Sequence, residues 1–253
     1  MTRYQVWLDG LGLQDVHPAI RVLDVQEETP SRQFTTASRA LGDGQFVTRR
    51  SRNSLSITVR FAIREYSPAR RKAIMQDIRA WAQGRWLSLG DRPGQRLLVE
   101  AETLPAVQSA LKWTDACSVS FIACASPYWE EAIPVQAGQA SPVITPPGDA
   151  PCCPLDLRWK CGSTSGKITL SVTTPLSSIV FSDLPINTGQ ELIISHENGF
   201  LSATVNGADV LACRTPQSSD DLLLNCRKAN AVTVSVTGAS TGDYTLSARG
   251  RWL

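Results

Sequence analysis

The sequence predicts a mainly β protein in two parts, with one helix flanking the first part. Three observations lead to this prediction. Apolar and polar residues alternate in several short segments of both halves, a single segment has helical spacing, and the proline-rich residues 134–154 separate the halves. The chain has 253 residues, 42% of them hydrophobic and 19% charged, so each part can bury a core of its own.

The clearest strand of the first part spans residues 55–63. Its odd-numbered residues are apolar and its even-numbered residues are polar, small or basic. Strict alternation over nine residues predicts one buried face and one polar, basic face. Further strands of the first part are predicted at residues 86–89, 96–102 and 116–124, and the turn residues 90–94 end the first of them.

One helix is predicted, over residues 68–83. Ser67 can cap its start, Pro68 suits its first position and Gly84 can close its end. The apolar residues recur with helical spacing and form a single stripe that can lie on a sheet. This stripe consists of Ile74, Ile78 and Trp81. The basic residues Arg70, Arg71 and Arg79 are expected on or near the outer faces of the helix.

The second part is predicted to be a β-sandwich. Short alternating segments follow one another at intervals of roughly ten residues, with turn residues between them. The predicted strands are residues 168–173, 191–196, 200–205, 210–213, 232–237 and 244–248. Asn206-Gly207 is the preferred dipeptide of a two-residue hairpin turn, so 210–213 is expected to be the return strand of 200–205.

The residue types needed for enzyme chemistry are scarce. The chain has two histidines and no G-x-S-x-G motif. The adjacent pairs Glu27-Glu28 and Glu130-Glu131 would point to opposite faces of a strand and are interpreted as solvated charges. We therefore predict that the protein is not an enzyme, with no catalytic residue, no cofactor and no metal site.

Seven cysteines are an odd number, and none of them forms a C-x-x-C pair. Reduced thiols are the favoured interpretation. Bridges between Cys161 and Cys152 or Cys153, or between Cys213 and Cys226, remain open.

Basic residues gather in one region although the net charge is only +2. Between Arg49 and Lys72 there are eight basic residues and one acid. We predict a subunit interface here, because guanidinium groups pair well with carboxylates of a neighbouring subunit. The candidate interface residues are Arg49, Arg50, Arg52, Arg60 and Arg64. A solvated surface is the second interpretation and phosphate contacts to nucleic acid the third, since the neighbouring aromatic residues lie on apolar faces.

The order of these segments resembles that of a known family. The corresponding segments are Arg49–Phe61, Ile78–Trp81, Leu87–Pro93, Ser126–Trp129, Asn206-Gly207, Asp220–Leu222, Ala229–Val234 and Ala248–Leu253. Taken together over nearly the whole chain, they resemble the distal tail proteins of long-tailed, non-contractile phages and prophages.

This resemblance implies a fold and a role. Residues 1–133 would be a β-sandwich or split-barrel-like domain related to tail-tube proteins, 134–154 a linker, and 155–253 a galectin-like β-sandwich. Proteins of this family form a ring, generally a hexamer, between the tail tube and the baseplate or tail tip. The implied protein is a structural hub of the virion tail. It would be assembled in the bacterial host cytoplasm, with tail-tube and tail-tip or baseplate proteins as its partners.

The polar, glycine-containing residues 30–54 fit this role as an extended hairpin that reaches the next subunit. No window approaches 18 consecutive apolar residues, so no membrane insertion is expected.

The alternative function is a carbohydrate-binding module that recognises host cell-wall sugars, because β-sandwiches commonly bind sugars. Its candidate stacking residues are Trp159, Phe181, Phe200, Tyr244 and Trp252, most of which we assign to the core.

Overall fold

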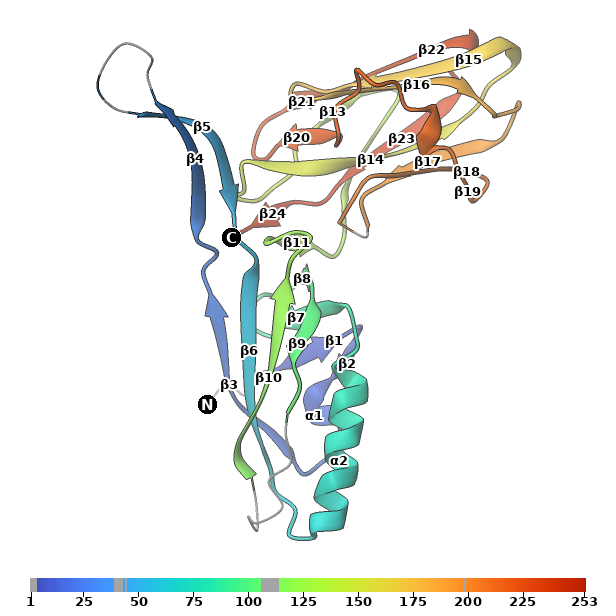
Figure 1. Ribbon diagram of the computed structural model, residues 1–253. Coiled ribbons are helices and arrows are strands. Elements are labelled where there is room, and N and C mark those ends of the chain that lie inside the picture. The colour runs from blue at the N-terminus through green and yellow to red at the C-terminus, as the bar shows by residue number, and fades with distance from the viewer. Residues whose placement is uncertain (1–3, 39–42, 44, 106–113, 198) are drawn as a thin grey trace. The chain divides into compact units, whose positions relative to one another are not determined.

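The computed structural model describes residues 4–38, 43, 45–105, 114–197 and 199–253 (Figure 1). The chain divides into two compact units, Met1–Trp129 and Glu130–Leu253. The protein is mainly β, as the sequence predicted. No helix within the described ranges is both long enough and apolar enough to cross a membrane.

The first unit contains ten strands and two helices among its described residues. They are β1 (Val6–Leu8), β2 (Leu11–Gly12), α1 (Leu13–Val16), β3 (Ile20–Glu28), β4 (Arg32–Ser38), β5 (Gln45–Arg52), β6 (Leu55–Ile63), α2 (Pro68–Trp81), β7 (Trp86–Leu89), β8 (Gln95–Leu98), β9 (Glu100–Thr103) and β10 (Thr114–Ala123). One sheet has the order β3-β6-β10-β9, a second contains β2, β1, β7 and β8 in that order, and β4 pairs with β5.

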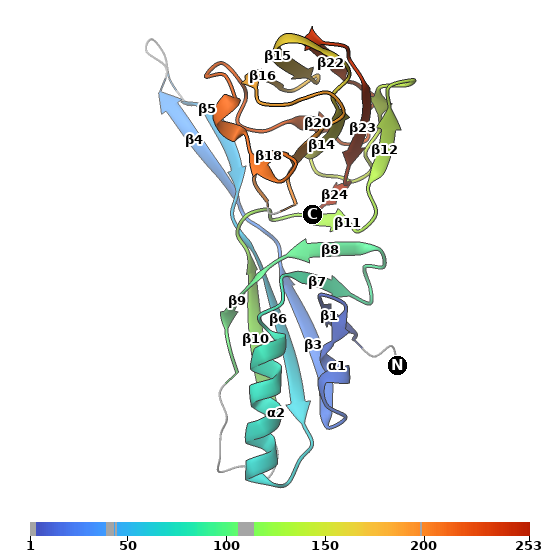
Figure 2. The same ribbon diagram turned by 90° about the vertical axis from the view of Figure 1, so that its right-hand side faces the viewer.

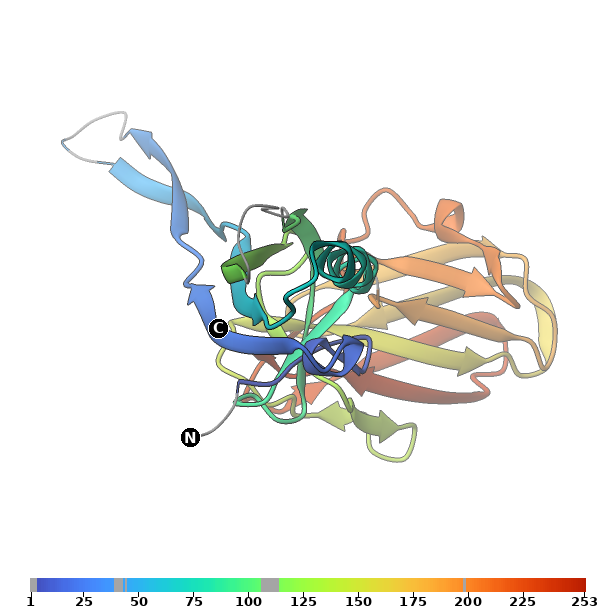
Figure 3. The same cartoon turned by 90° about the horizontal axis from the view of Figure 1, so that it is seen from below.

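Strand β6 is the centre of the first unit's core. Its residues at positions 55, 57, 59, 61 and 63 are at most 1% exposed, which confirms the alternation expected from the sequence. Helix α2 lies against this sheet (Figures 2 and 3), where Trp81 meets Phe121 of β10 edge to face at 5.9 Å. The Ser67 hydroxyl accepts the Arg70 N–H at 3.5 Å, so the predicted helix cap is confirmed.

Strand β3 was missed by the sequence analysis. Its apolar residues do not alternate cleanly, because a bulge between Val22 and Asp24 shifts its register against β6. A bulge reverses the faces on which the following residues lie, and this breaks the period of two.

The second unit is a sandwich of two sheets. Its elements are β11 (Trp129–Glu131), β12 (Val135–Gly138), β13 (Val143–Ile144), β14 (Cys152–Lys160), β15 (Thr164–Thr173), β16 (Ser178–Leu184), β17 (Glu191–Ser195), β18 (Ser202–Val205), β19 (Ala208–Asp209), η1 (Leu211–Cys213), β20 (Leu223–Asn225), β21 (Asn230–Ala231), β22 (Thr233–Ala239), β23 (Asp243–Ala248) and β24 (Arg251–Trp252). One sheet runs β12-β23-β14-β17-β18-β19, with β20 also on β14, and the other runs β16-β15-β22. Trp159 of β14 in the first sheet and Phe181 of β16 in the second are fully buried.

The hairpin turn of the second unit is confirmed, but the return strand predicted at 210–213 is wrong. Asn206 and Gly207 have φ angles of 48° and 84°, as a two-residue turn of this type requires. The return strand is only β19, and residues 211–213 form the short helix η1 instead of a strand. The Asp209 carboxylate accepts the Leu211 N–H at 2.8 Å, and this turn ends the pairing.

The proline-rich residues 134–154 are not a free linker. They contain β12, which is an edge strand paired with β23, and β13, which pairs with β21. Prolines are tolerated at strand ends and sheet edges, where their missing N–H breaks no ladder bond. Interpreting this stretch as a linker also hid the start of β14, a central strand whose Pro154 lies opposite Leu223.

Candidate subunit interface

The five candidate arginines lie on two different sheets of the first unit. Arg49 and Arg50 belong to β5, where their backbones are opposite Thr35 and Phe34; their side chains lie outside the described part of the chain. Arg60 of β6 and Arg64, just after it, are exposed on the polar side of the four-stranded sheet. The basic run therefore belongs to a hairpin and to a sheet face.

At the base of the β4–β5 hairpin, two arginines face each other. Arg52 is directly opposite Arg32, which is exposed, while Arg52 is half-buried. Like charges directly opposite each other in a ladder are destabilising. A carboxylate from another molecule placed between them would relieve this repulsion.

The hairpin also exposes large apolar side chains. Phe34 is 55% exposed, Phe46 49% and Val47 41%. From the register, Phe34 and Val47 are on one face of the hairpin, whereas Phe46 is opposite Ala37 on the other. Both faces of the hairpin therefore offer apolar surface.

The hairpin is a sheet of two strands within the described residues, with no third strand beside it (Figure 1). Each strand has one edge without ladder partners. Two-stranded sheets are marginally stable in water, and open edges invite pairing with another chain. Exposed aromatics, opposed arginines and open edges together make this hairpin the best candidate for an interface in the first unit.

The basic residues of helix α2 were partly misplaced by the sequence analysis. Arg71, expected on an outer face, is 2% exposed, and its guanidinium donates to the carbonyls of Glu65 and Tyr66 at 3.0 and 3.4 Å. Arg79 donates to the carbonyl of Pro105 at 2.9 Å. Both arginines bind loop carbonyls of the first unit, and Arg79 is exposed, as the sequence predicted.

One glutamate of each adjacent pair makes structural contacts. Glu27 accepts from Arg92 at 3.0 Å and from the Trp129 indole at 2.9 Å. Glu130 is 8% exposed and pairs with Arg251 at 2.6 Å, so this residue is not a solvated charge as the sequence suggested. Neither glutamate shares a site with a second carboxylate of its own pair.

His196 is a buried histidine of the second unit. It is 8% exposed, and its Nδ1 lies 3.1 Å from the Asp156 carboxylate. Its Nε2 has no hydrogen-bond partner and lies 3.9 Å from Asp221. No group of three or more histidines, cysteines or acids within the described ranges could hold a metal ion.

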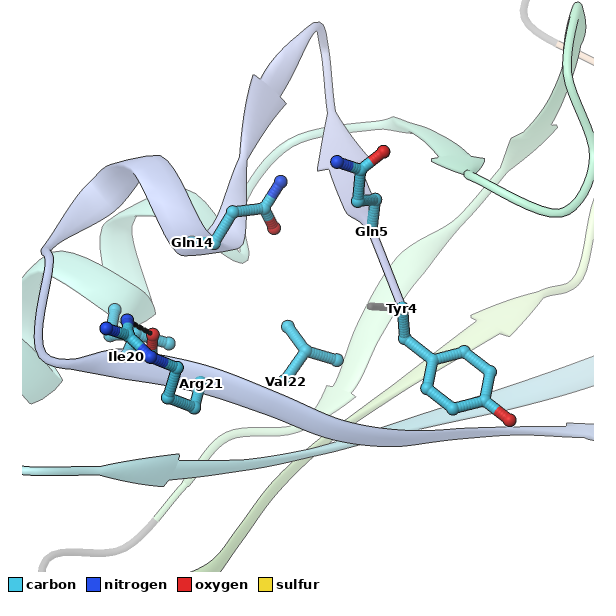
Figure 4. A pocket seen from close by; sticks show the side chains of 6 residues that line it. All are labelled: Tyr4, Gln5, Gln14, Ile20, Arg21 and Val22. Carbon is cyan, nitrogen blue, oxygen red and sulfur yellow. Dashed lines mark hydrogen bonds between the residues drawn. The ribbon is translucent and has the colours of Figure 1, made fainter. Parts of the chain in front are cut away.

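A small pocket of the first unit lies between the first strand, α1 and β3 (Figure 4). Its volume is about 160 Å³, and it is lined by Tyr4, Gln5, Gln14, Ile20, Arg21 and Val22. The Arg21 guanidinium is turned to its own backbone, donating to the carbonyls of Pro18 and Ile20 at 2.7 Å. The lining offers neither a nucleophile nor a general base, so the hairpin remains the better candidate for function.

The aromatic residues considered for sugar stacking do not form a platform. Trp159 and Phe181 are fully buried, and Tyr244 and Trp252 are half-buried. Phe200 is the exposed member of the five, at 62%. A single exposed ring gives no specific support to carbohydrate binding.

Solved structures with this fold are known, although no protein-family model and no curated protein sequence matches the chain. The Dit protein (gp 19.1) of phage SPP1, described as a paradigm of the hub adsorption apparatus in phages that infect Gram-positive hosts, matches with a TM-score of 0.69 and 14% identity over 100% of both chains. A chain of the phage P2 baseplate in its activated conformation with Ca matches with a TM-score of 0.54 and 7% identity, covering 99% of this chain and 98% of that one. The same baseplate with Sr matches at 0.51 and 7%, covering 98% and 97%. The chain therefore has the fold of the SPP1 Dit hub protein along its whole length.

Proposed function

We propose that this chain is a structural, non-enzymatic hub of a phage tail, assembling as a ring of about six copies between the tail tube and the host-adsorption apparatus. The likeness to the SPP1 hub protein over the whole chain supports this proposal. Its partners would be tail-tube and tail-tip or baseplate proteins, and its place the virion tail after assembly in the bacterial host cytoplasm.

The observation that carries the proposal is the β4–β5 hairpin. It exposes apolar residues on both faces and leaves its strand edges open, so a second copy of this chain is the occupant we assign to it. The first unit also exposes carboxylates on its edge strand β9, at Glu100 and Glu102. An acidic edge and a basic hairpin on one chain are complementary between copies, which favours self-association.

The candidate interface residues remain part of this proposal. Arg49, Arg50 and Arg52 would bind the neighbour through the hairpin, and Arg60 and Arg64 through the polar sheet face. The double substitution Arg49→Glu with Arg50→Glu should give a folded monomer that no longer assembles. Light scattering after size exclusion measures the assembly, and the far-ultraviolet circular dichroism spectrum checks the fold.

The matched control is Arg158→Glu, which reverses one exposed strand arginine of the second unit. This variant should assemble like the unchanged protein. If the Arg49→Glu, Arg50→Glu protein forms the same particle as the unchanged protein, the hairpin is not the assembly surface.

A further inference from the structure

Three cysteines of the second unit meet where β14 pairs with β20. Cys152 and Cys153 begin β14, in register with Asn225 and Leu224, and Cys226 directly follows β20. Cys153 and Cys226 are therefore diagonal neighbours on the same face of the ladder. Each thiol shifts the pKa of the other. All seven cysteines are reduced in this structure.

This pairing was not among those that the sequence left open. The sequence considered Cys213 as the partner of Cys226, and Cys161 as the partner of Cys152 or Cys153. The structure instead brings Cys226 to Cys153, because β20 returns alongside the first residues of β14.

The backbone around Cys226 is fixed on both sides. The Asn225 N–H donates to the side-chain oxygen of Asn230 at 2.9 Å, and Asn230 is fully buried. The Arg227 N–H donates to the carbonyl of Pro146 at 2.8 Å. Cys153 is held in the β14 ladder. The two thiols are thus kept together by the fold itself.

The surroundings shift the pKa values of the two thiols in opposite directions. Hydrogen bonding from Cys153 and from the Arg251 backbone, together with the Arg251 guanidinium, lowers the pKa of Cys226 to about 7, against the opposing effect of burial. The same hydrogen bond and burial raise the pKa of Cys153. Negative charge is therefore favoured on Cys226 and the proton on Cys153. Thiolates, not thiols, are the nucleophiles in cysteine oxidation.

The exposed fractions of the two cysteines also favour Cys226 as the nucleophile. Cys226 is 8% exposed, whereas Cys153 is completely buried. Cys226 is therefore the more accessible of the two residues to a small oxidant such as hydrogen peroxide. Susceptibility to oxidation follows thiolate character and exposure, and both favour Cys226.

We propose that Cys153 and Cys226 form a peroxide-reactive dithiol site, in which Cys226 is the nucleophile and Cys153 the resolving thiol. The Cys226 thiolate attacks one oxygen of hydrogen peroxide, breaks the O–O bond and becomes a sulfenic acid as hydroxide leaves. The Cys153 sulfur then attacks the Cys226 sulfur and expels hydroxide, which takes up the Cys153 proton to form water. The sulfurs are oxidised to a disulfide and the peroxide is reduced to water.

The disulfide would tie the central strand β14 to the end of β20. It would close a long loop, from residue 153 to residue 226, and a long loop gives a large loss of entropy in the unfolded chain. We expect the melting temperature to rise by on the order of 10 °C on oxidation. The site is distinct from the hairpin, so the proposal does not depend on ring assembly.

The test treats the full-length reduced protein with hydrogen peroxide, alkylates it under denaturing conditions and maps its peptides by mass spectrometry. We expect one disulfide, joining the peptides of Cys153 and Cys226, and the melting temperature to rise. The matched control is Cys152→Ser, which removes the neighbouring thiol and should leave the disulfide unchanged. The Cys153→Ala variant should instead accumulate a sulfenic acid at Cys226, detected with dimedone.

If the protein without substitutions keeps all seven thiols after peroxide treatment, the proposal is overturned. A map that joins Cys226 to Cys152 or to another cysteine overturns it as well. If dimedone labels Cys153 or Cys152 in preference to Cys226, the assignment of the nucleophile is wrong. These readouts are independent of whether the protein forms a ring.

Discussion

Strand β6 and the hairpin directly before it, β4–β5, place their apolar residues in opposite ways. In β6 the apolar residues are at most 1% exposed, whereas Phe34 and Phe46 of the hairpin are about half exposed, at 55% and 49%. Both segments form antiparallel ladders, and each ladder includes a register shift. The difference shows that β6 is stabilised by the core of its own unit, while the hairpin has apolar surface left for another molecule.

The largest expected effect on stability comes from removing a buried ring of β6. Phe61→Ala should lower the free energy of unfolding by about 3–5 kcal/mol, because it removes a buried ring and leaves a cavity. The matched variant Phe34→Ala should change it by less than about 0.5 kcal/mol. Urea denaturation of both variants in the unassembled Arg49→Glu, Arg50→Glu background measures the difference. Equal losses would show that the hairpin is part of the unit's own core.

The same contrast between enclosed and exposed groups applies to ion pairs. Glu130 and Arg251 have side chains 11% and 13% exposed, whereas those of Lys167 and Asp183 are 84% and 63% exposed. Glu130→Ala should cost about 3 kcal/mol, because the Arg251 guanidinium loses this carboxylate in an enclosed site. Lys167→Ala should cost less than about 1 kcal/mol. Chemical denaturation of the two variants tests this, and similar costs would contradict it.

A smaller effect is expected at the helix cap. Ser67→Ala should cost about 1 kcal/mol or less, since the cap bond to the Arg70 N–H is long at 3.5 Å. Ser51→Ala, at an exposed site of the hairpin, should leave the melting temperature unchanged. Thermal unfolding of both variants gives the comparison, and a larger loss at Ser51 would reverse it.

The smallest expected effect is a dependence on pH at Glu65. The Ser67 N–H donates to its carboxylate at 3.0 Å and lowers its pKa below the usual 4.5, with Arg70 contributing. The stabilisation is therefore fully present above pH 4.5 and is lost as the pH falls through the lower pKa of the folded state. The difference in melting temperature between the unchanged protein and Glu65→Gln should shrink below pH 4.5. A difference that grows in acid would contradict this assignment.

Regular alternation let the sequence predict β6, and the cap and stripe of α2 were equally clear. Strand β3 was not predicted, because a bulge breaks the alternation of its apolar and polar residues. Strand β14 was not predicted either, because the prolines at its start led us to interpret a central strand as part of a linker. The sequence placed Arg71 in solvent because helical spacing alone does not show that a long side chain reaches loop carbonyls. The cluster of basic residues could be recognised in the sequence. Only the strand pairing showed that some of them belong to the β4–β5 hairpin and others to the face of the four-stranded sheet.

The placement of Cys153 beside Cys226 could not be predicted from the sequence for a similar reason. The two residues are far apart in the chain, and only the pairing of β20 with β14 brings them together. Exposed aromatics in the hairpin were likewise not foreseen, because alternation predicts which residues share a face and not what covers that face.

The most direct test of the hub proposal is the mass of the unchanged protein in solution, measured by analytical ultracentrifugation over a series of concentrations. The proposal predicts a closed particle of about six times the 27.5 kDa of one chain, and rings in electron micrographs. A particle with the mass of a single chain at every concentration would contradict it.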